Sequence, residues 1–63
     1  MLLLNEDDNI ANIIIENIDM YLSLDCSMFL LSSNKNIKIV EYLSNNENLI
    51  NWNRYLKNPT AAP

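Results

Sequence analysis

Few of the side chains that perform enzyme chemistry occur in this chain of 63 residues. Histidine, the usual general base, is absent, and Cys26 is the only cysteine. A reactive thiolate is normally assisted by histidine or a nearby cation, whereas Asp25 precedes Cys26, so we interpret Cys26 as a small buried thiol. Asp7 and Asp8 would diverge on a helix, and no carboxylates have the spacing of a shared acid–base site. We therefore expect no catalysis, with Cys26 as the one nucleophile to alkylate in a test.

The sequence also lacks the patterns that hold metals and cofactors. A lone thiol without histidine cannot supply the ligands that zinc takes. Residues 6–9 offer oxygen ligands for calcium but no glycine-containing loop, and a chain without glycine has no phosphate-binding loop. We predict no metal site and no cofactor.

The charge pattern bears on the kind of partner. The net charge of −4 opposes binding to nucleic acid, which depends on neutralising phosphates. Residues 1–32 hold six acidic and no basic side chains, whereas residues 33–63 hold four basic and two acidic ones. This asymmetry either steers a partner of complementary charge or lets the two halves lie against each other. Trp52, Arg54 and Tyr55 form a secondary candidate patch, although helix-end cations and core aromatics would give the same pattern.

The length and composition predict one small intracellular domain. A chain this short buries only about 60% of its unfolded surface, and with one cysteine it cannot form an internal disulfide. Its stability must come from helix packing and from a partner. No apolar run exceeds four residues and no basic segment precedes residues 2–4, so we expect neither a membrane span nor a signal peptide. We predict a cytoplasmic location.

Hydrophobic spacing predicts helices rather than strands. The best-supported helix covers residues 9–22, capped by Asp8 or Asn9, with one apolar stripe along it. A second helix, buried on most sides, is expected over about 25–33. The stripe consists of Ile10, Ile13, Ile14, Ile18, Tyr21 and Leu22.

The second half of the chain is predicted to add two shorter helices. Residues 34–36 are typical of a turn, and residues 37–43 suit either a strand or a helix, of which we favour the helix. Ser44 and Glu47 have the spacing of a capping box, which predicts a helix over 46–57 that Pro59 ends. With an arm over residues 1–8 and a frayed tail over 59–63, the fold expected is an all-α bundle of three to four short helices.

A short motif recurs along the chain. Residues 18–23 read Ile-Asp-Met-Tyr-Leu-Ser and residues 39–44 read Ile-Val-Glu-Tyr-Leu-Ser, and a partial copy occurs as Tyr-Leu at residues 55–56. The spacing of the copies is too uneven for a regular solenoid. We interpret Tyr-Leu-Ser as a mark of similar helix ends.

Residues 10–37 resemble the F-box, a three-helix module that docks proteins onto the adaptor subunit of cullin-type ubiquitin ligases. Ile10-Ala11 stands where the family has Leu-Pro, Ile14-Ile15 replaces its apolar pair, and Asn34-Lys35-Asn36-Ile37 replaces its closing Lys-x-Trp segment. Ala11 and Ile37 therefore depart from the family's proline and tryptophan. The resemblance implies an adaptor-binding face made by Ile10, Ile14, Ile18, Leu22, Leu30 and Lys35.

These observations predict a non-catalytic module that binds another protein through an apolar helical face. One role is that of a small regulator, inhibitor or adaptor, and F-box-like docking would be a case of it. The other is that of a structural subunit or cement piece in a larger assembly, such as a viral particle. Self-association of the purified chain would favour the structural role.

Overall fold

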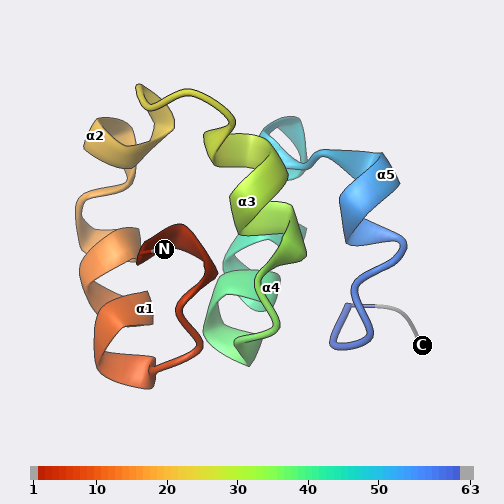
Figure 1. The fold of residues 1–63 in the computed structure, drawn as a ribbon, viewed down its shortest axis with the longest axis horizontal. Coiled ribbons are helices and arrows are strands. Elements are labelled where there is room, and N and C mark those ends of the chain that lie inside the picture. The colour runs from red at the N-terminus through yellow and green to blue at the C-terminus, as the bar shows by residue number, and fades with distance from the viewer. Residues whose placement is uncertain (1, 62–63) are drawn as a thin grey trace.

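The computed structural model describes residues 2–61, which fold into short helices (Figure 1). The described part of the chain contains no strand, which confirms the all-α prediction. The elements, in which η marks a 3-10 helix, are η1 (Leu2–Leu4), α1 (Asp8–Glu16), α2 (Ile18–Leu22), α3 (Ser27–Ser33), α4 (Ile37–Ser44), η2 (Glu47–Leu49) and α5 (Trp52–Tyr55).

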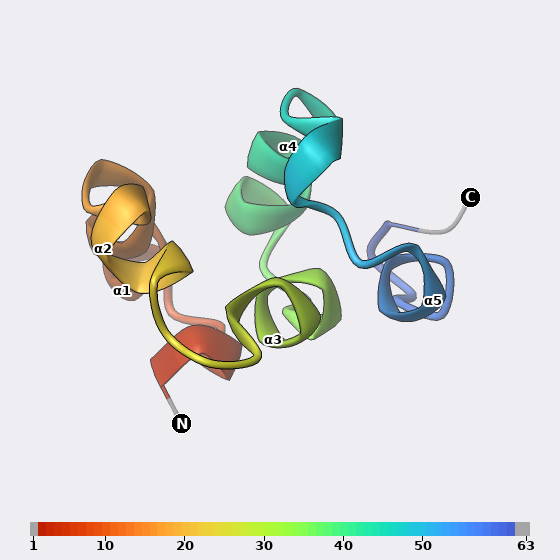
Figure 2. The same cartoon turned by 90° about the horizontal axis from the view of Figure 1, so that it is seen from above.

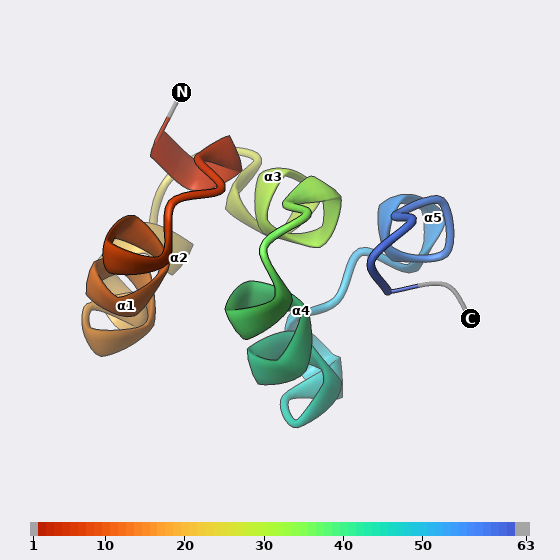
Figure 3. The ribbon, with the colours of Figure 1, turned by 90° about the horizontal axis from the view of Figure 1, so that it is seen from below.

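The helices lie in a row along the long axis of the molecule (Figures 1 and 2). α1 and α2 occupy one end, α3 and α4 the middle, and α5 the other end. η1 lies against α3, α1 packs on α4, and α5 packs on α3, an order that is also visible from below (Figure 3). The middle helices thus have neighbours on both sides, whereas each end of the row has one side that faces outward.

The helix predicted over residues 9–22 is in fact two helices that meet at Asn17. The Asn17 side chain donates to the carbonyl oxygen of Ile13 (2.9 Å), which also accepts from the Asn17 backbone N–H (3.1 Å). Asparagine side chains compete with helical hydrogen bonds in this way, and Asn17 leaves the helical region with φ −119°. The break turns α2 away from the axis of α1.

The N-terminus of α1 is capped by Asp7, not by Asp8 or Asn9 as predicted. The Asp7 carboxylate accepts hydrogen bonds from the backbone N–H groups of Asn9 (2.8 Å) and Ile10 (3.3 Å). These two groups would otherwise lack partners at a helix start. Asp7 is one of three acidic residues in a row, so the sequence identified the cap region but not the residue.

The prediction that Cys26 is buried is wrong. Its side chain is exposed, and its backbone lies in the left-handed region with φ 61° and ψ 18°. Cys26 is the only non-glycine residue with a positive φ in the described part of the chain, and it stands directly before α3. The left-handed conformation costs an L-residue about 1–2 kcal/mol, a penalty that glycine avoids. Cys26 therefore turns the chain into α3 at a local cost in energy.

Replacing Cys26 with glycine is expected to stabilise the fold. Relief of the left-handed strain exceeds the extra chain entropy of glycine, so we expect a gain of up to about 1 kcal/mol. Such a gain would raise the Tm by roughly 4–8 °C in a domain of this size. Cys26→Ala is the matched control and should melt close to the wild type. A Gly variant that melts below the Ala variant would contradict the strain at this position.

The helix that we favoured over residues 37–43 is present as α4. Asn36 caps its start, because its side-chain oxygen accepts from the Lys38 N–H (2.8 Å). Its end also confirms the interpretation of the Tyr-Leu-Ser motif. The Ser23 hydroxyl at the end of α2 and the Ser44 hydroxyl at the end of α4 each donate to the carbonyl three residues earlier, at 2.6 Å and 2.7 Å.

Ser44 therefore belongs to the end of α4, and the predicted capping box with Glu47 does not form. In place of one helix over 46–57, the chain forms η2, two extended residues and then α5. Ile50 leaves the helical region because its side chain enters the core, and the Asn51 N–H donates to the Ser32 hydroxyl (2.8 Å). The Asn51 side chain then caps α5 by accepting from Arg54 N–H (3.3 Å).

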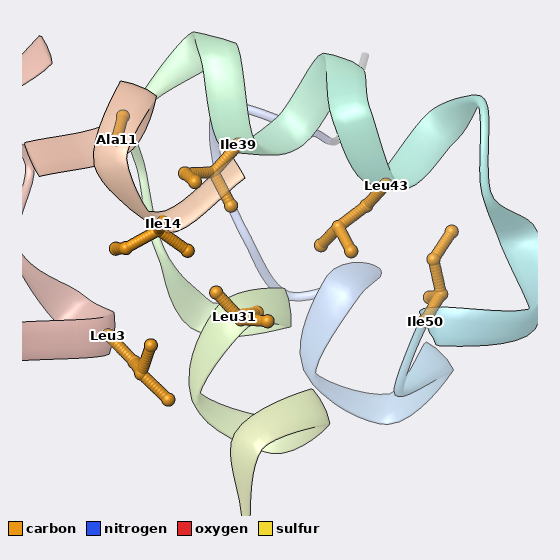
Figure 4. Packing of buried hydrophobic residues seen from close by; sticks show 7 residues of the cluster. All are labelled: Leu3, Ala11, Ile14, Leu31, Ile39, Leu43 and Ile50. Atoms are coloured by element: carbon orange, nitrogen blue, oxygen red, sulfur yellow. The ribbon is translucent and has the colours of Figure 1, made fainter. Parts of the chain in front are cut away.

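The core is small and draws one or two side chains from each major element (Figure 4). η1, α1, α3, α4 and the segment before α5 all contribute to it. A small core is expected of a chain that buries only about 60% of its surface. Its buried apolar members are Leu3, Ala11, Ile14, Leu31, Ile39, Leu43 and Ile50.

Three buried asparagines, Asn34, Asn36 and Asn58, supplement this core, and we call them the asparagine cluster. The Asn34 amide donates to the carbonyl oxygens of Leu3 (3.0 Å) and Asn5 (2.9 Å). Its side-chain oxygen accepts from the Asn36 N–H (2.8 Å). Across residues 2–61, every buried side-chain nitrogen or oxygen has a hydrogen-bond partner. The cluster thus ties η1 and its following residues to the α3–α4 loop.

Asn36 binds the rest of the predicted N-terminal arm. Its amide donates to the carbonyl oxygen of Glu6 (2.7 Å) and to the carboxylate of Asp8 (2.8 Å). Residues 2–6 and the first residue of α1 are therefore held against the loop between α3 and α4. The turn predicted over residues 34–36 is instead a loop in which Asn34 and Asn36 are extended and buried.

Asn58 attaches the segment that follows α5. Its amide donates to the carbonyl oxygen of Asn34 (2.6 Å), and the Thr60 hydroxyl donates to that of Lys35 (2.8 Å). The frayed tail was predicted over residues 59–63, of which the last two lie outside the described residues. Through these bonds the same loop fixes the position of α5, which carries the candidate surface described next.

Candidate binding surface

The side chains of interest lie on the surface of the molecule. Residues 2–61 enclose no pocket, and they contain no group of three or more His, Cys, Asp or Glu side chains that could hold a metal ion. None of the helices described is long and apolar enough to cross a bilayer. We therefore consider which exposed apolar side chains lie together and which charges accompany them.

The apolar residues of the predicted adaptor-binding face point towards the inside of the molecule. Ile14 is fully buried, and Lys35 is exposed in the loop between α3 and α4. The remaining members are partly buried and pack against the core, and they are Ile10, Ile18, Leu22 and Leu30. In this structure α1 uses its apolar side to bind α4. Partner binding by these residues stays a prediction, and it would require them to leave the core.

The same residues carry the F-box resemblance. Docking to a ligase adaptor would use side chains that here contact one another, so the structure offers that face no exposed apolar surface of its own. Adaptor docking therefore also stays a prediction from the sequence.

The secondary candidates Trp52, Arg54 and Tyr55 come together on α5. The Trp52 and Tyr55 rings meet edge to face, with centroids 5.6 Å apart and planes at 79°. The Arg54 guanidinium carbon lies 4.6 Å from the centre of the Phe29 ring on α3, and Arg54 Nε donates to the Ser33 hydroxyl (3.2 Å). A cation above an aromatic ring is attracted by the negative face of the ring. Arg54 therefore attaches α5 to α3.

The opposite side of α5 points away from the molecule. Arg54 faces α3, and the Tyr55 hydroxyl donates to the carbonyl oxygen of Val40 on α4 (3.4 Å). At about 100° per residue, the side facing away from both neighbours carries Asn53 and Leu56, and Trp52 and Lys57 lie at its two edges. Trp52 is 49% exposed and Leu56 is 68% exposed. We call Trp52, Leu56 and Lys57 the α5 outer face.

Phe29 is a surface residue that sequence reasoning missed. The helix around it was predicted to be buried on most sides, but Met28 and Phe29 are both exposed. A short helix with four apolar residues in a row, at positions 28–31, cannot turn them all inward, because adjacent residues point about 100° apart. That geometry was the available signal, and it did not show which of the residues would face out. The exposed ring contacts Arg54 on the side of α5 that faces α3.

The other end of the row exposes a surface of opposite charge. Ile13 and Glu16, which lie one turn apart on α1, are exposed, as are Asp19 and Met20 on α2. We call these four residues the α1–α2 outer face. Residues 9–34 contain no lysine or arginine, whereas residues 48–61 contain no aspartate or glutamate. Exposed apolar side chains thus lie beside Glu16 and Asp19 at the α1–α2 end, where Lys38 of α4 also donates to Asn12 (3.3 Å), and beside Lys57 at the α5 end.

Comparison of the chain with protein-family models, with curated proteins and with solved structures finds no match. The geometry of these two outer faces is therefore the basis for a functional hypothesis.

Proposed function

We propose that this chain is a small helical bundle that binds another protein, without catalysis, through the α5 outer face. The observation that supports the proposal most is the exposure of Trp52 and Leu56 one helical turn apart. Tryptophan is enriched among the residues that dominate binding energy at protein interfaces. Full burial of a large apolar side chain contributes about 1.5–3 kcal/mol, so covering this pair would be favourable.

The residues around Trp52 and Leu56 favour a specific contact over non-specific hydrophobic association. Tyr55 supports the Trp52 ring from one side, which limits the entropy that Trp52 would lose on binding. Lys57 follows Leu56 and is exposed, and Arg54 holds α5 to Phe29 of α3 from the opposite side of the helix. A protein with an apolar contact region and acidic residues at its edge has the complementary chemistry.

A partner would also add to the stability of the fold. The core contains few fully buried apolar side chains, and anything that binds only the folded chain shifts the folding equilibrium towards it. Within this proposal the chain acts as a regulator, an inhibitor or an adaptor, and the structural-subunit role is the alternative. We also infer an intracellular location, because a single exposed thiol is stable to oxidation only in a reducing compartment.

The immobilised double variant Trp52→Ser, Leu56→Ser is expected to capture at least ten-fold less partner protein from the native host than the immobilised wild type does. Both side chains are largely exposed, so the far-UV circular dichroism spectrum should not change. Ile37→Ser is the matched control, because Ile37 is equally exposed at the start of α4. The ligase adaptor belongs among the proteins probed in the captured fraction. Equal capture by the double variant and the wild type would refute the α5 outer face as the contact.

A further inference from the structure

Comparison of two copies of the Tyr-Leu motif shows that apolar side chains which neighbouring helices bury in α4 are exposed in α5. In each copy, the residue three before the tyrosine and the leucine after it lie one turn apart on the same helix side. In α4 these are Ile39 and Leu43, which are 2% and 1% exposed because α1 and α3 pack over them. In α5 they are Trp52 and Leu56, which are 49% and 68% exposed. The same stripe is thus buried in the middle of the row and open at its end.

The arrangement of the helices explains this difference. α1, α3 and α4 bury apolar side chains, whereas α5 is the last helix of the row and has no buried residue (Figure 2). In molecules built from stacked helical layers, terminal layers stay soluble by carrying polar outer surfaces. Here the last layer carries a tryptophan and a leucine instead. A further helical layer placed beside α5 would cover the stripe as α1 and α3 cover it in α4.

The charges at the two ends of the molecule indicate which molecule could supply that further helical layer. The cation of the α5 outer face is Lys57, because Arg54 turns towards Phe29 and Ser33 of α3, and residues 48–61 contain no acidic residue. The α1–α2 outer face, at the opposite end of the same molecule, offers Glu16 and Asp19 beside exposed Ile13 and Met20. Apolar side chains and charges are therefore complementary between the two ends, and opposite charges bring complementary surfaces into register.

We propose that copies of this chain associate head to tail, with the α5 outer face of one copy seated on the α1–α2 outer face of the next. The inference rests on the proposed function and names its partner as a second copy. Because the two faces differ, the contact is heterologous, and each added copy leaves one open face at either end. Association therefore continues into chains or closes into a ring, and it does not stop at a symmetric dimer.

Two variants that each block one end test this geometry. Leu56→Asp places a carboxylate in the α5 outer face, and Met20→Lys places a cation in the α1–α2 outer face; both positions are exposed, so both variants should fold. In sedimentation velocity, the wild type should form species that grow with concentration, and each variant alone should be a monomer. An equimolar mixture should form a one-to-one dimer and nothing larger, because only one pair of intact faces remains.

Charge variants give a second readout that does not depend on the apolar side chains. Lys57→Glu and Asp19→Lys, both at exposed positions, should each weaken self-association at least ten-fold. Mixing them should restore growing species in which the two variants alternate, because opposite charges then meet at both faces of every copy. Raising the salt concentration should weaken the wild-type assembly, because exposed charges are screened.

Three results would overturn the inference: a wild type that stays monomeric at millimolar concentration, a single blocked variant that still forms chains, or a mixture that forms no dimer. None of these three results by itself contradicts the proposed function. A monomeric wild type whose partner capture is lost in the Trp52→Ser, Leu56→Ser variant would leave protein binding in place and remove only self-association. Capture that survives in that variant would remove the proposed function.

Discussion

Asn34→Ala is expected to lower the free energy of unfolding by about 3 kcal/mol or more, which is a large part of the roughly 3–9 kcal/mol available to a domain of this length. The Asn34 side chain is fully buried and makes three hydrogen bonds to backbone groups. Alanine would leave two carbonyl oxygens and one N–H without partners in the interior. Each such group costs about 1–3 kcal/mol.

Urea denaturation followed by circular dichroism measures this loss as a shift in the midpoint. Asn48→Ala is the matched control, because Asn48 is exposed in η2, and it should unfold within about 0.5 kcal/mol of the wild type. Asn34→Asp should be at least as damaging as Asn34→Ala, since a carboxylate would face two carbonyl oxygens that need donors. Equal midpoints for Asn34→Ala and Asn48→Ala would show that the asparagine cluster does not hold the fold together.

Leu43→Ala and Leu56→Ala make the same change at the same place in the Tyr-Leu motif. The first is expected to lower stability and the second to weaken binding. Leu43 is buried among the core residues, so its truncation leaves a cavity and should cost about 2–5 kcal/mol. Leu56 is mostly exposed, and its truncation should change the unfolding free energy by no more than about 0.5 kcal/mol. Leu56→Ala should instead weaken binding through the α5 outer face.

Thermal melting of both variants at low protein concentration separates the two effects. Low concentration matters because a partner that covers Leu56 would stabilise the folded state and hide the comparison. A Leu56→Ala variant as unstable as Leu43→Ala would mean that Leu56 belongs to the core, and the α5 outer face would then have to be abandoned.

Local sequence signals predicted the parts of this fold that depend on nearby residues. The all-α class, the helix break at residues 34–36 and the helix from residue 37 follow from apolar spacing and capping chemistry, which act within a few positions. The helix breaks at Asn17 and Ile50 were missed because they depend on other interactions. At Asn17 a side chain shares the carbonyl oxygen that its own backbone N–H also bonds, and at Ile50 the distant core determines the local conformation.

The candidate surface was predicted in part for a similar reason. Trp52, Arg54 and Tyr55 are close in the sequence, so their grouping on one short helix could be anticipated. The apolar stripe that includes Ile14 was also identified, but periodicity does not show whether a stripe meets its own chain or a partner. Here it meets α4. Phe29 joins the surface only through Arg54, twenty-five positions away, and no local pattern indicates that contact.

The asparagine cluster joins segments that are far apart along the chain, and this has a consequence for biosynthesis. Asn34 bonds to Leu3 across 31 positions, and Asn58 bonds to Ser32 across 26. Contacts of such separation form slowly because the intervening chain must first be ordered. When the ribosome has released only α1 to α4, the carbonyl oxygens of Ser32 and Asn34 still lack the Asn58 amide that donates to them. The native state is therefore completed only after residue 58 emerges, and until then the nascent chain exposes its small core to chaperones and proteases.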